Sequence, residues 1–172
     1  MPNWCSNVAQ ISHSDKFEID KIENELSNEE SSELFNTLLT RPLSEEDNWY
    51  GWNVENWGTK WDATICYWER LDENTLMVEF DTAWSPPVNL YDTLTEKMGY
   101  QINAQYFEPG MGFVGEYIDG NDSYYEYDVS DKESWSDIPE DLIDFAGIEH
   151  DHESYLEHYG DEDEDSESDK EG

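Results

Sequence analysis

The chain has 172 residues, of which 44 are acidic and 8 are Lys or Arg, so its formal net charge is −36. Aromatic residues make up 15% of it, and this content excludes a chain that is disordered throughout. The charge excludes nonspecific binding to nucleic acid or anionic lipid, because both require Lys and Arg to neutralise phosphate.

The N-terminal segment, the apolar runs and the cysteines indicate the cellular compartment of the protein. The first ten residues, MPNWCSNVAQ, lack the basic and apolar regions of a signal peptide. No apolar run approaches the roughly 18 residues that span a membrane. Cys5 and Cys66 do not have the spacing of a disulfide framework and suit a reducing compartment. We therefore expect a cytoplasmic protein without a membrane partner.

The N-terminal part of the chain predicts a strand followed by a helix. Residues 3–13 predict a short strand with Ala9 and Ile11 facing the core. Residues 15–26 carry apolar residues at helical spacing. This order is the beginning of a βα unit.

Residues 27–39 predict either a continuation of this helix, broken once, or a second short helix. Ser27 and Glu30 have the spacing of a capping box, and Pro42 ends the helical pattern. Residues 41–61 then predict a long polar connection that is rich in tryptophan. Loops of this length in a compact domain are usually functional or disordered, and the aromatic content favours function.

The middle of the chain completes a recognisable order of elements. Residues 63–70 and 75–83 predict two strands around a turn. A helix over 84–99 has Ser85 as its expected N-cap, and residues 100–108 predict an alternating strand. Strand–helix–strand–strand–helix–strand is the split βαβ, ferredoxin-like pattern of an α+β fold.

The C-terminal part predicts additions to this fold. Residues 113–129 predict a β-hairpin, and residues 137–146 predict a short helix with Asp137 as its N-cap. The run of like charges toward the end predicts an acidic, flexible extension. The expected units are a ferredoxin-like domain (1–118), an extension of it by the hairpin and short helix (119–148), and an acidic flexible tail (149–172).

Four motifs carry a resemblance to a known family. They are MPNWCSN at the start, WYGWNVENWGTKWDA at 49–63, FDTAWSPP at 80–87 and EPGMGFVGEY at 108–117. In this order they resemble the YubB-type ferredoxin-like domain family of phage and plasmid proteins, over about residues 2–118. The resemblance implies a ferredoxin-like fold and a mobile-element origin, and it implies no particular activity.

Tryptophans before the second strand and after the third strand predict either a ligand site or a small core. In a ferredoxin-like fold the loop before that strand and the turn into the second helix can lie at the same end of the sheet. An aromatic box with a Lys, an Asp and a helix N-terminus could hold a flat ring or an anion. The same rings could instead only pin the long loop to the sheet. The residues concerned are Trp49, Trp52, Trp57, Lys60, Trp61, Asp62, Trp84 and Ser85.

The sequence predicts no enzyme, cofactor or metal site. It contains no nucleophile elbow, phosphate-binding glycine loop or zincin motif. The spacing of His150, His152 and His158 fits no structural zinc site. Among 44 acids no carboxylate pair can be singled out for acid–base catalysis.

The acids toward the C-terminus predict a binding surface. Residues 116–172 carry 23 acids and two bases, whereas the longer preceding part carries 21 acids and six bases. Carboxylates on ordered elements can present a field like that of DNA to a basic cleft. They could equally serve only solubility. The expected partner-binding residues are Glu116, Asp119, Asp122, Glu126, Asp128, Asp137, Glu140, Asp141 and Asp144.

Charge and resemblance together predict a stoichiometric inhibitor. We expect a phage or plasmid counter-defence protein whose acidic, DNA-mimicking surface binds a basic host protein, a nucleic-acid enzyme of the restriction or CRISPR type. No direct contact with nucleic acid is expected. The alternative is a small-ligand or nucleotide-binding module that uses the tryptophan site.

Overall fold

A computed structural model of the chain describes residues 2–30 and 33–168, with side chains as far as residue 160. The strands are β1 (Trp4–His13), β2 (Thr64–Asp72), β3 (Thr75–Ala83), β4 (Tyr100–Glu108), β5 (Phe113–Ile118) and β6 (Asn121–Glu126). The helices of the described part are α1 (Lys16–Leu26), α2 (Leu34–Leu38), α3 (Trp49–Asn56), α4 (Val88–Lys97), α5 (Glu140–Ala146) and α6 (Ile148–Ser168), with the 3-10 helices η1 (Leu43–Asn48) and η2 (Lys132–Trp135).

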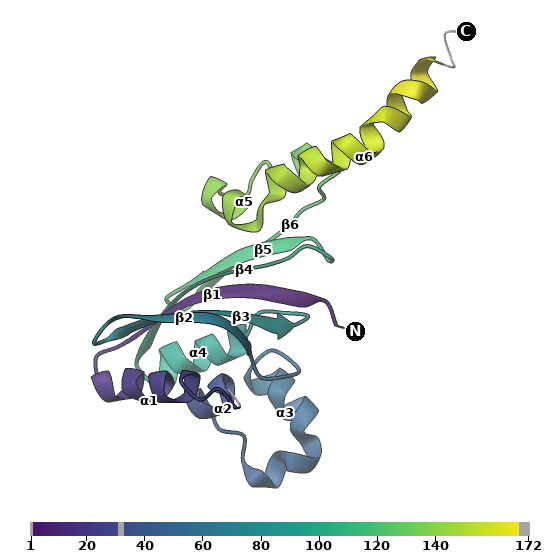
Figure 1. Ribbon diagram of the computed structural model, residues 1–172. Coiled ribbons are helices and arrows are strands. Elements are labelled where there is room, and N and C mark those ends of the chain that lie inside the picture. The colour runs from purple at the N-terminus through teal and green to yellow at the C-terminus, as the bar shows by residue number, and fades with distance from the viewer. Residues whose placement is uncertain (1, 31–32, 169–172) are drawn as a thin grey trace.

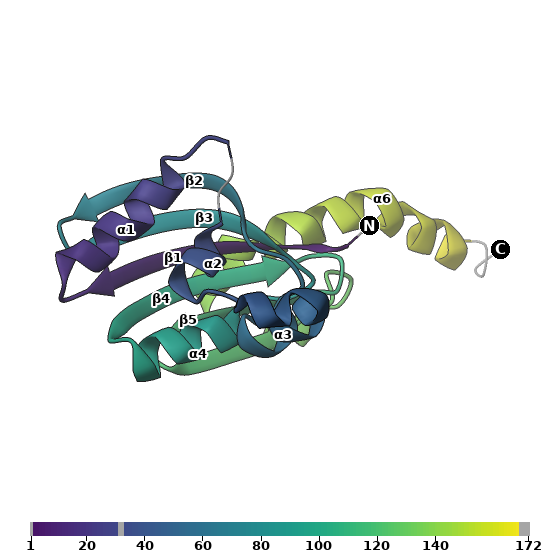
Figure 2. The same cartoon turned by 90° about the horizontal axis from the view of Figure 1, so that it is seen from below.

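The strands form a six-stranded antiparallel sheet in the order β2-β3-β1-β4-β5-β6. Helices α1 and α4 cover one face of it, and α5 and α6 lie on the opposite side over β4 and β5 (Figures 1 and 2). The first four strands with α1 and α4 have the split βαβ topology. The predicted ferredoxin-like α+β fold is therefore confirmed, and the hairpin β5–β6 continues the same sheet.

The main core lies between the sheet and the helices α1, α2 and α4. Strand residues alternate between faces, so Ala9 and Ile11 of β1 face these helices and are buried, as predicted. A second core lies on the other face beneath α5 and α6, where Leu142 and Ile148 are fully buried beside Val114 of β5. The sheet is therefore buried on both faces at its β4–β5 side.

The prediction of a loop over residues 41–61 is wrong, because this segment contains η1 and α3. Its Gly and Asn residues are typical of loops, but tertiary contacts override this preference. Asn53 of α3 is buried, and its side-chain amide donates a hydrogen bond to the carbonyl of Lys60. This contact between α3 and the following loop favours the helix.

The predicted capping box is also wrong. Ser27 ends α1, and its hydroxyl donates to the carbonyl of Glu23. The next helix, α2, begins at Leu34. Its first N–H groups bond to the side chain of Asp62, which is far away in the sequence. A cap supplied from a distance leaves no local sequence pattern.

Two further predicted N-caps are displaced by proline. Helix α4 begins after Pro87 and α5 begins after Pro139. A residue that precedes proline is disfavoured in the helical region. Pro86 precedes Pro87 and is therefore disfavoured in the helical region, so α4 begins only at Val88, with Pro87 at the N-cap position, and Ser85 lies outside it. Asp137 is likewise outside α5.

The C-terminal segment differs from the predicted flexible tail. The structure has a 21-residue helix, α6, over Ile148–Ser168, and it projects beyond the sheet (Figure 1). Gly147 at φ 67° separates α6 from α5. The buried Ile148 anchors the helix, and His152 contacts the carbonyl of Val129 through Nδ1. Residues 169–172 of the predicted tail lie outside the described part.

Candidate functional site

The predicted tryptophan site is partly assembled in the structure. Trp49, Trp57, Trp61 and Asp62 line a common cavity of about 230 Å³ between α2, α3 and the loop before β2. The cavity also contains Glu33, Asn36, Arg41 and Asn53. Four of the eight predicted residues therefore meet at one place.

Trp57 is a core residue. Its side chain is 2% exposed, and its indole Nε1 donates to the carbonyl of Leu39 at 3.0 Å. The rings of Phe35 and Trp52 meet it edge to face, with centroids 5.8 and 5.5 Å away. Trp57 thus pins α2 and α3 to the core, as the alternative interpretation of this motif predicts.

Asp62 has a structural role, because its side chain caps the first turn of α2 from a distant position in the sequence. Its two carboxylate oxygens accept hydrogen bonds from the backbone N–H groups of Phe35 (2.8 Å) and Asn36 (3.0 Å). The N–H of Ala63 also donates to it. Burial raises the pKa of Asp62 to about 6, although these three N–H groups act in the opposite direction.

We expect Asp62→Asn to alter the pH dependence of stability. Because the pKa of Asp62 is raised in the folded state, the folded protein binds this proton more tightly than the unfolded chain does. This stabilisation is complete below pH 4 and is lost as the pH rises through 6. Between pH 5 and 7.5 the wild-type protein should lose about 1 kcal/mol of unfolding free energy relative to Asp62→Asn. Urea titrations of both proteins measure this difference, and a difference that does not change with pH contradicts the assignment.

The remaining predicted residues do not line the cavity and have other roles. The hydroxyl of Ser85 donates to the carbonyl of Gly58 at 2.7 Å, and this bond ties the loop before β2 to the turn before α4. Trp84 is 48% exposed at the end of β3. The ammonium of Lys60 lies over the ring of Trp61, 4.6 Å from its centroid.

The nine predicted partner-binding acids do not form one surface. Residues that pair across antiparallel strands point to the same face, so Asp122 shares the face of Tyr117. The phenol of Tyr106 on that face donates to Asp122 at 2.6 Å. Glu116 is adjacent to Tyr117 in β5 and points to the opposite face. The prediction grouped these acids because they are close in the sequence. The alternation of side chains along the strands places them on opposite faces of the sheet.

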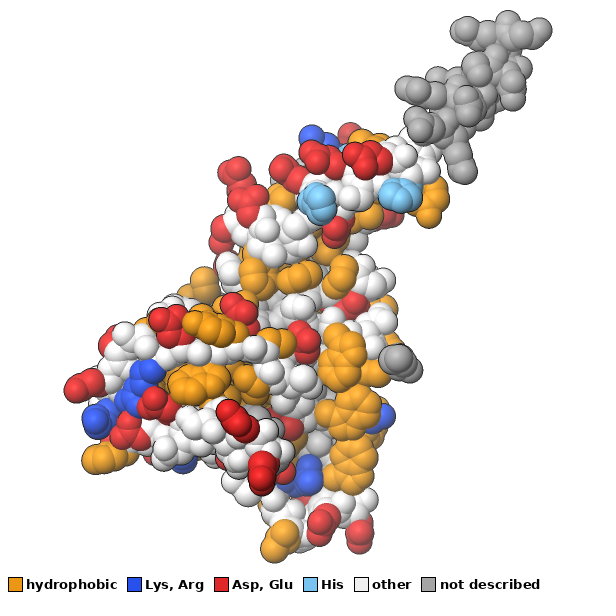
Figure 3. Space-filling model, viewed as in Figure 1, with side chains coloured by type: hydrophobic (Ala, Val, Ile, Leu, Met, Phe, Trp, Pro, Cys, Tyr) orange, Lys and Arg blue, Asp and Glu red, His pale blue; other side chains and the backbone are white. Residues whose placement is uncertain are grey.

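Acids from different elements do converge around α5. Glu116 of β5 and Asp141 of α5 line one depression of about 420 Å³, whose base is the uncovered face of the sheet. Asp144 of α5 and Glu149 and Glu153 of α6 line a second depression of about 320 Å³. Figure 3 shows acidic side chains over these two helices. We define the acidic surface as Glu116, Glu140, Asp141, Asp144, Glu149 and Glu153.

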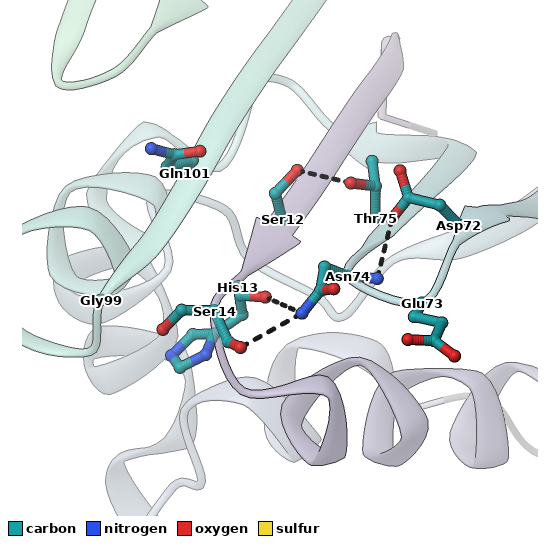
Figure 4. Close-up of a pocket in the computed structure, with 9 residues that line it drawn as sticks. All are labelled: Ser12, His13, Ser14, Asp72, Glu73, Asn74, Thr75, Gly99 and Gln101. Carbon is teal, nitrogen blue, oxygen red and sulfur yellow. Dashed lines mark hydrogen bonds between the residues drawn. The ribbon is translucent and has the colours of Figure 1, made fainter.

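A larger depression of about 760 Å³ at the other end of the sheet was not predicted (Figure 4). At its centre the amide of Asn74 donates to the carbonyls of His13 (2.9 Å) and Ser14 (3.2 Å). The hydroxyls of Ser12 and Thr75 bond to each other. Because these polar groups are paired within the chain, the depression is explained by the β2–β3 turn and the end of β1.

Sequence reasoning missed four polar residues of the tryptophan cavity, and two of them, Arg41 and Asn53, contact each other. The guanidinium of Arg41 donates to the side-chain oxygen of Asn53 at 2.9 Å. A lone Arg before a proline and an Asn within a predicted loop give no signal by themselves. Their proximity depends on α3, which the sequence did not predict.

Among the helices that the structure describes, none is long and apolar enough to cross a membrane. A family model described as "Ferredoxin-like domain in Api92-like protein" matches residues 60–171. The crystal structure of a protein api92 from Yersinia pseudotuberculosis is 22% identical, with a TM-score of 0.42. That similarity covers 55% of this chain and 39% of the Yersinia protein, so this chain spans well under half of its length. No curated protein matches the chain.

The family match covers more than half of the chain, and its description as a ferredoxin-like domain agrees with the fold of the structure. It begins later than the resemblance to YubB-type proteins, which therefore stays a prediction. The chain belongs to the family of ferredoxin-like domains in Api92-like proteins.

Proposed function

We propose that this protein binds a basic host protein through its acidic surface and inhibits it by occupying a nucleic-acid-binding cleft. In this proposal it is a counter-defence protein of phage or plasmid origin, of YubB type, that acts in the cytoplasm of the host cell. Its target is a nucleic-acid enzyme of the restriction or CRISPR type, and it acts by stoichiometric binding without catalysis.

The observation that carries the proposal is the convergence of exposed acids around α5. Glu140, Asp141 and Asp144 are exposed on α5, and Glu149 and Glu153 are exposed on α6. Lys132 is the one Lys or Arg among the described residues after Lys97. A basic cleft that approaches this side therefore meets carboxylates with little competing positive charge.

The spacing of these acids supports mimicry of a phosphate backbone. Glu149, Glu153 and Glu157 are four residues apart, which places them about 6 Å apart along the axis of α6. Phosphates on one strand of DNA rise about 3.4 Å per nucleotide, so the two charge densities are of the same order. The buried residues beneath α5 hold these acids on an ordered element.

Neutralising the acidic surface should abolish binding to the target. The immobilised protein is incubated with lysate of a bacterial host at low and at high salt, and retained proteins are identified by mass spectrometry. We expect one nucleic-acid-handling enzyme to bind at low salt and to be released by salt. The variant Glu140→Gln/Asp141→Asn/Asp144→Asn/Glu149→Gln should lose at least about tenfold in affinity for it.

A matched variant separates a specific surface from general charge. Glu29, Glu30, Glu73 and Glu96 are exposed acids on the α1–α4 side and its adjoining turns. Replacing these four by Gln changes the net charge by the same amount and should leave target binding nearly unchanged. An equal loss in both variants, or no salt-sensitive enzyme in the lysate, overturns the proposal.

A second candidate function, a small-ligand or nucleotide-binding module, is favoured by the tryptophan cavity. Arg41 lines this cavity together with Trp49 and Trp61, a set of side chains suited to a flat anionic ligand. Two of its other walls, Trp57 and Asp62, already serve the core and the α2 cap. Trp61→Ala should abolish nucleotide binding while leaving the salt-sensitive enzyme bound.

A further inference from the structure

Three of the sequence motifs place exposed aromatic residues at one end of the sheet. Trp4 begins β1, Tyr50 lies in α3, Trp61 precedes β2 and Trp84 follows β3. Their side chains are 42%, 55%, 37% and 48% exposed, in that order. The ring centroids of Trp4 and Trp61 are 6.2 Å apart. We call these four residues the aromatic patch. In Figure 3 a column of hydrophobic side chains with a basic residue beside it lies on this side of the molecule.

The backbone of Trp84 has a strained conformation, and a hydrogen bond holds this residue next to the start of β1. Its φ is 71°, in the left-handed region that bulky residues rarely adopt. Such a conformation costs on the order of 1–3 kcal/mol and persists only where surrounding contacts impose it. Its N–H donates to the carbonyl of Asn3 at 2.8 Å, next to Trp4. The chain thus accepts strain at a tryptophan that remains half exposed.

The area of the patch fits the centre of a protein interface. An aromatic side chain buries about 150–250 Å² when covered, so the exposed fractions leave on the order of 400 Å² of aromatic surface. Exposed patches of this size on soluble proteins are often functional. Trp, Tyr and Arg are the residues that most often dominate binding energy at interfaces.

The charges around the patch identify the partner's chemistry. Glu46 and Asp47 precede Tyr50 in η1, Glu55 lies near the end of α3, and all three are exposed. Within the patch itself the ammonium of Lys60 lies 4.6 Å from the centroid of Trp61 and 5.3 Å from that of Tyr50. These rings therefore already hold a cation on their faces.

We propose that the aromatic patch docks an arginine-containing segment of a partner protein. Arginine side chains stack on the exposed rings, and the carboxylates of Glu46, Asp47 and Glu55 attract the positive charge around them. Lys60 occupies one of these ring faces in the free protein and is displaced on binding. The inference goes beyond the proposed function, because the aromatic patch and the acidic surface share no residue.

The test uses a short peptide of alternating arginine and leucine as the probe. Its binding to the full chain is followed through the indole N–H signals in ¹⁵N NMR spectra, which report on each of the eight tryptophans separately. We expect the signals of Trp4, Trp61 and Trp84 to shift and that of the buried Trp57 to stay. Trp61→Ala should weaken binding by about tenfold, with the remaining indole signals showing that the fold is intact.

The sign of the effect at Lys60 decides between cationic and anionic ligands. Lys60→Gln vacates the face of the Trp61 ring and removes a positive charge that repels the arginines of the peptide. It should therefore strengthen peptide binding by about two- to fivefold. ATP, used as an anionic probe, should leave the patch indoles unshifted. Weaker peptide binding in Lys60→Gln, or indole shifts with ATP instead of the peptide, overturns the proposal in favour of an anion site.

The four-acid variant of the acidic surface is the matched control. It lowers the general attraction of the protein for a basic peptide, but it should leave the pattern of shifted indoles unchanged. If that variant abolishes the shifts of Trp4, Trp61 and Trp84, the peptide binds at the acidic surface and the aromatic patch is not its site. Failure of the proposed function alone leaves these shifts in place.

Discussion

Replacing Trp57 by Ala is expected to lower the free energy of unfolding by about 3–5 kcal/mol. The side chain is 2% exposed and fills the space between α2, α3 and the sheet, where it contacts Phe35 and Trp52. The substitution leaves a cavity and also leaves the carbonyl of Leu39 without the indole N–H that donates to it. Because folded domains are stable by only about 5–15 kcal/mol, such a loss removes a large share of the stability of the folded state.

Urea denaturation measures this effect, and Trp61→Ala is the control. Trp61 is a tryptophan of the same motif but is 37% exposed, so its replacement removes far less buried contact. We expect its unfolding free energy to fall by roughly 1 kcal/mol or less. Equal losses in the two variants would contradict the division of this motif into a core residue and a surface residue.

The sequence predicted the ferredoxin-like fold because its signals are local. Apolar alternation marks β1, β3 and β4, and helical spacing marks α1 and α4. Each of these patterns extends over a single element, and the order of the elements leaves few topologies. The buried positions Ala9 and Ile11 were therefore correctly assigned before any long-range contact was known.

Elements that depend on distant partners could not be predicted. The side chain that caps the first turn of α2 belongs to Asp62, which is separated from Phe35 by 27 residues. Helix α3 has weak intrinsic propensity and depends on Asn53, which bonds to both Arg41 and Lys60. Neither arrangement has a sequence pattern, so both were missed together with the cavity that they create.

The candidate acidic surface was predicted only in part. An acidic residue can be expected to be exposed, but this does not determine the face of the molecule on which it lies. Glu116 and Asp122 both lie on the predicted hairpin, yet strand alternation turns them to opposite faces. Glu149 and Glu153 were assigned to a tail, although α6 places them beside Asp144. A charged residue in a sequence is easily recognised as exposed, but its face depends on register and packing.

The EPGMG motif has a structural explanation centred on Glu108, the last residue of β4. Its carboxylate is 2% exposed and accepts hydrogen bonds from the N–H groups of Gly110 and Met111, both at 2.6 Å. The amide of Asn3 also donates to it, at 3.4 Å. A Cβ at Gly110 would approach the Glu108 carboxylate to 2.8 Å, so the carboxylate would have to shift to accommodate it. One buried carboxylate thus links the N-terminal motif to the β4–β5 turn.

Glu108→Ala is therefore expected to lower the unfolding free energy by about 3 kcal/mol, because it removes the buried carboxylate that accepts two hydrogen bonds from the turn amides of Gly110 and Met111. Urea denaturation gives the total loss, and hydrogen exchange at the amides of Gly110 and Met111 shows whether the turn opens. Glu116→Ala removes a carboxylate from the next strand that accepts no such bonds among the described residues, and it should change stability by less than about 0.5 kcal/mol. If the two variants are equally stable, or if the turn amides keep their protection in Glu108→Ala, then Glu108 does not hold the turn. The turn would in that case depend on the backbone bond from Tyr127 to Gly112.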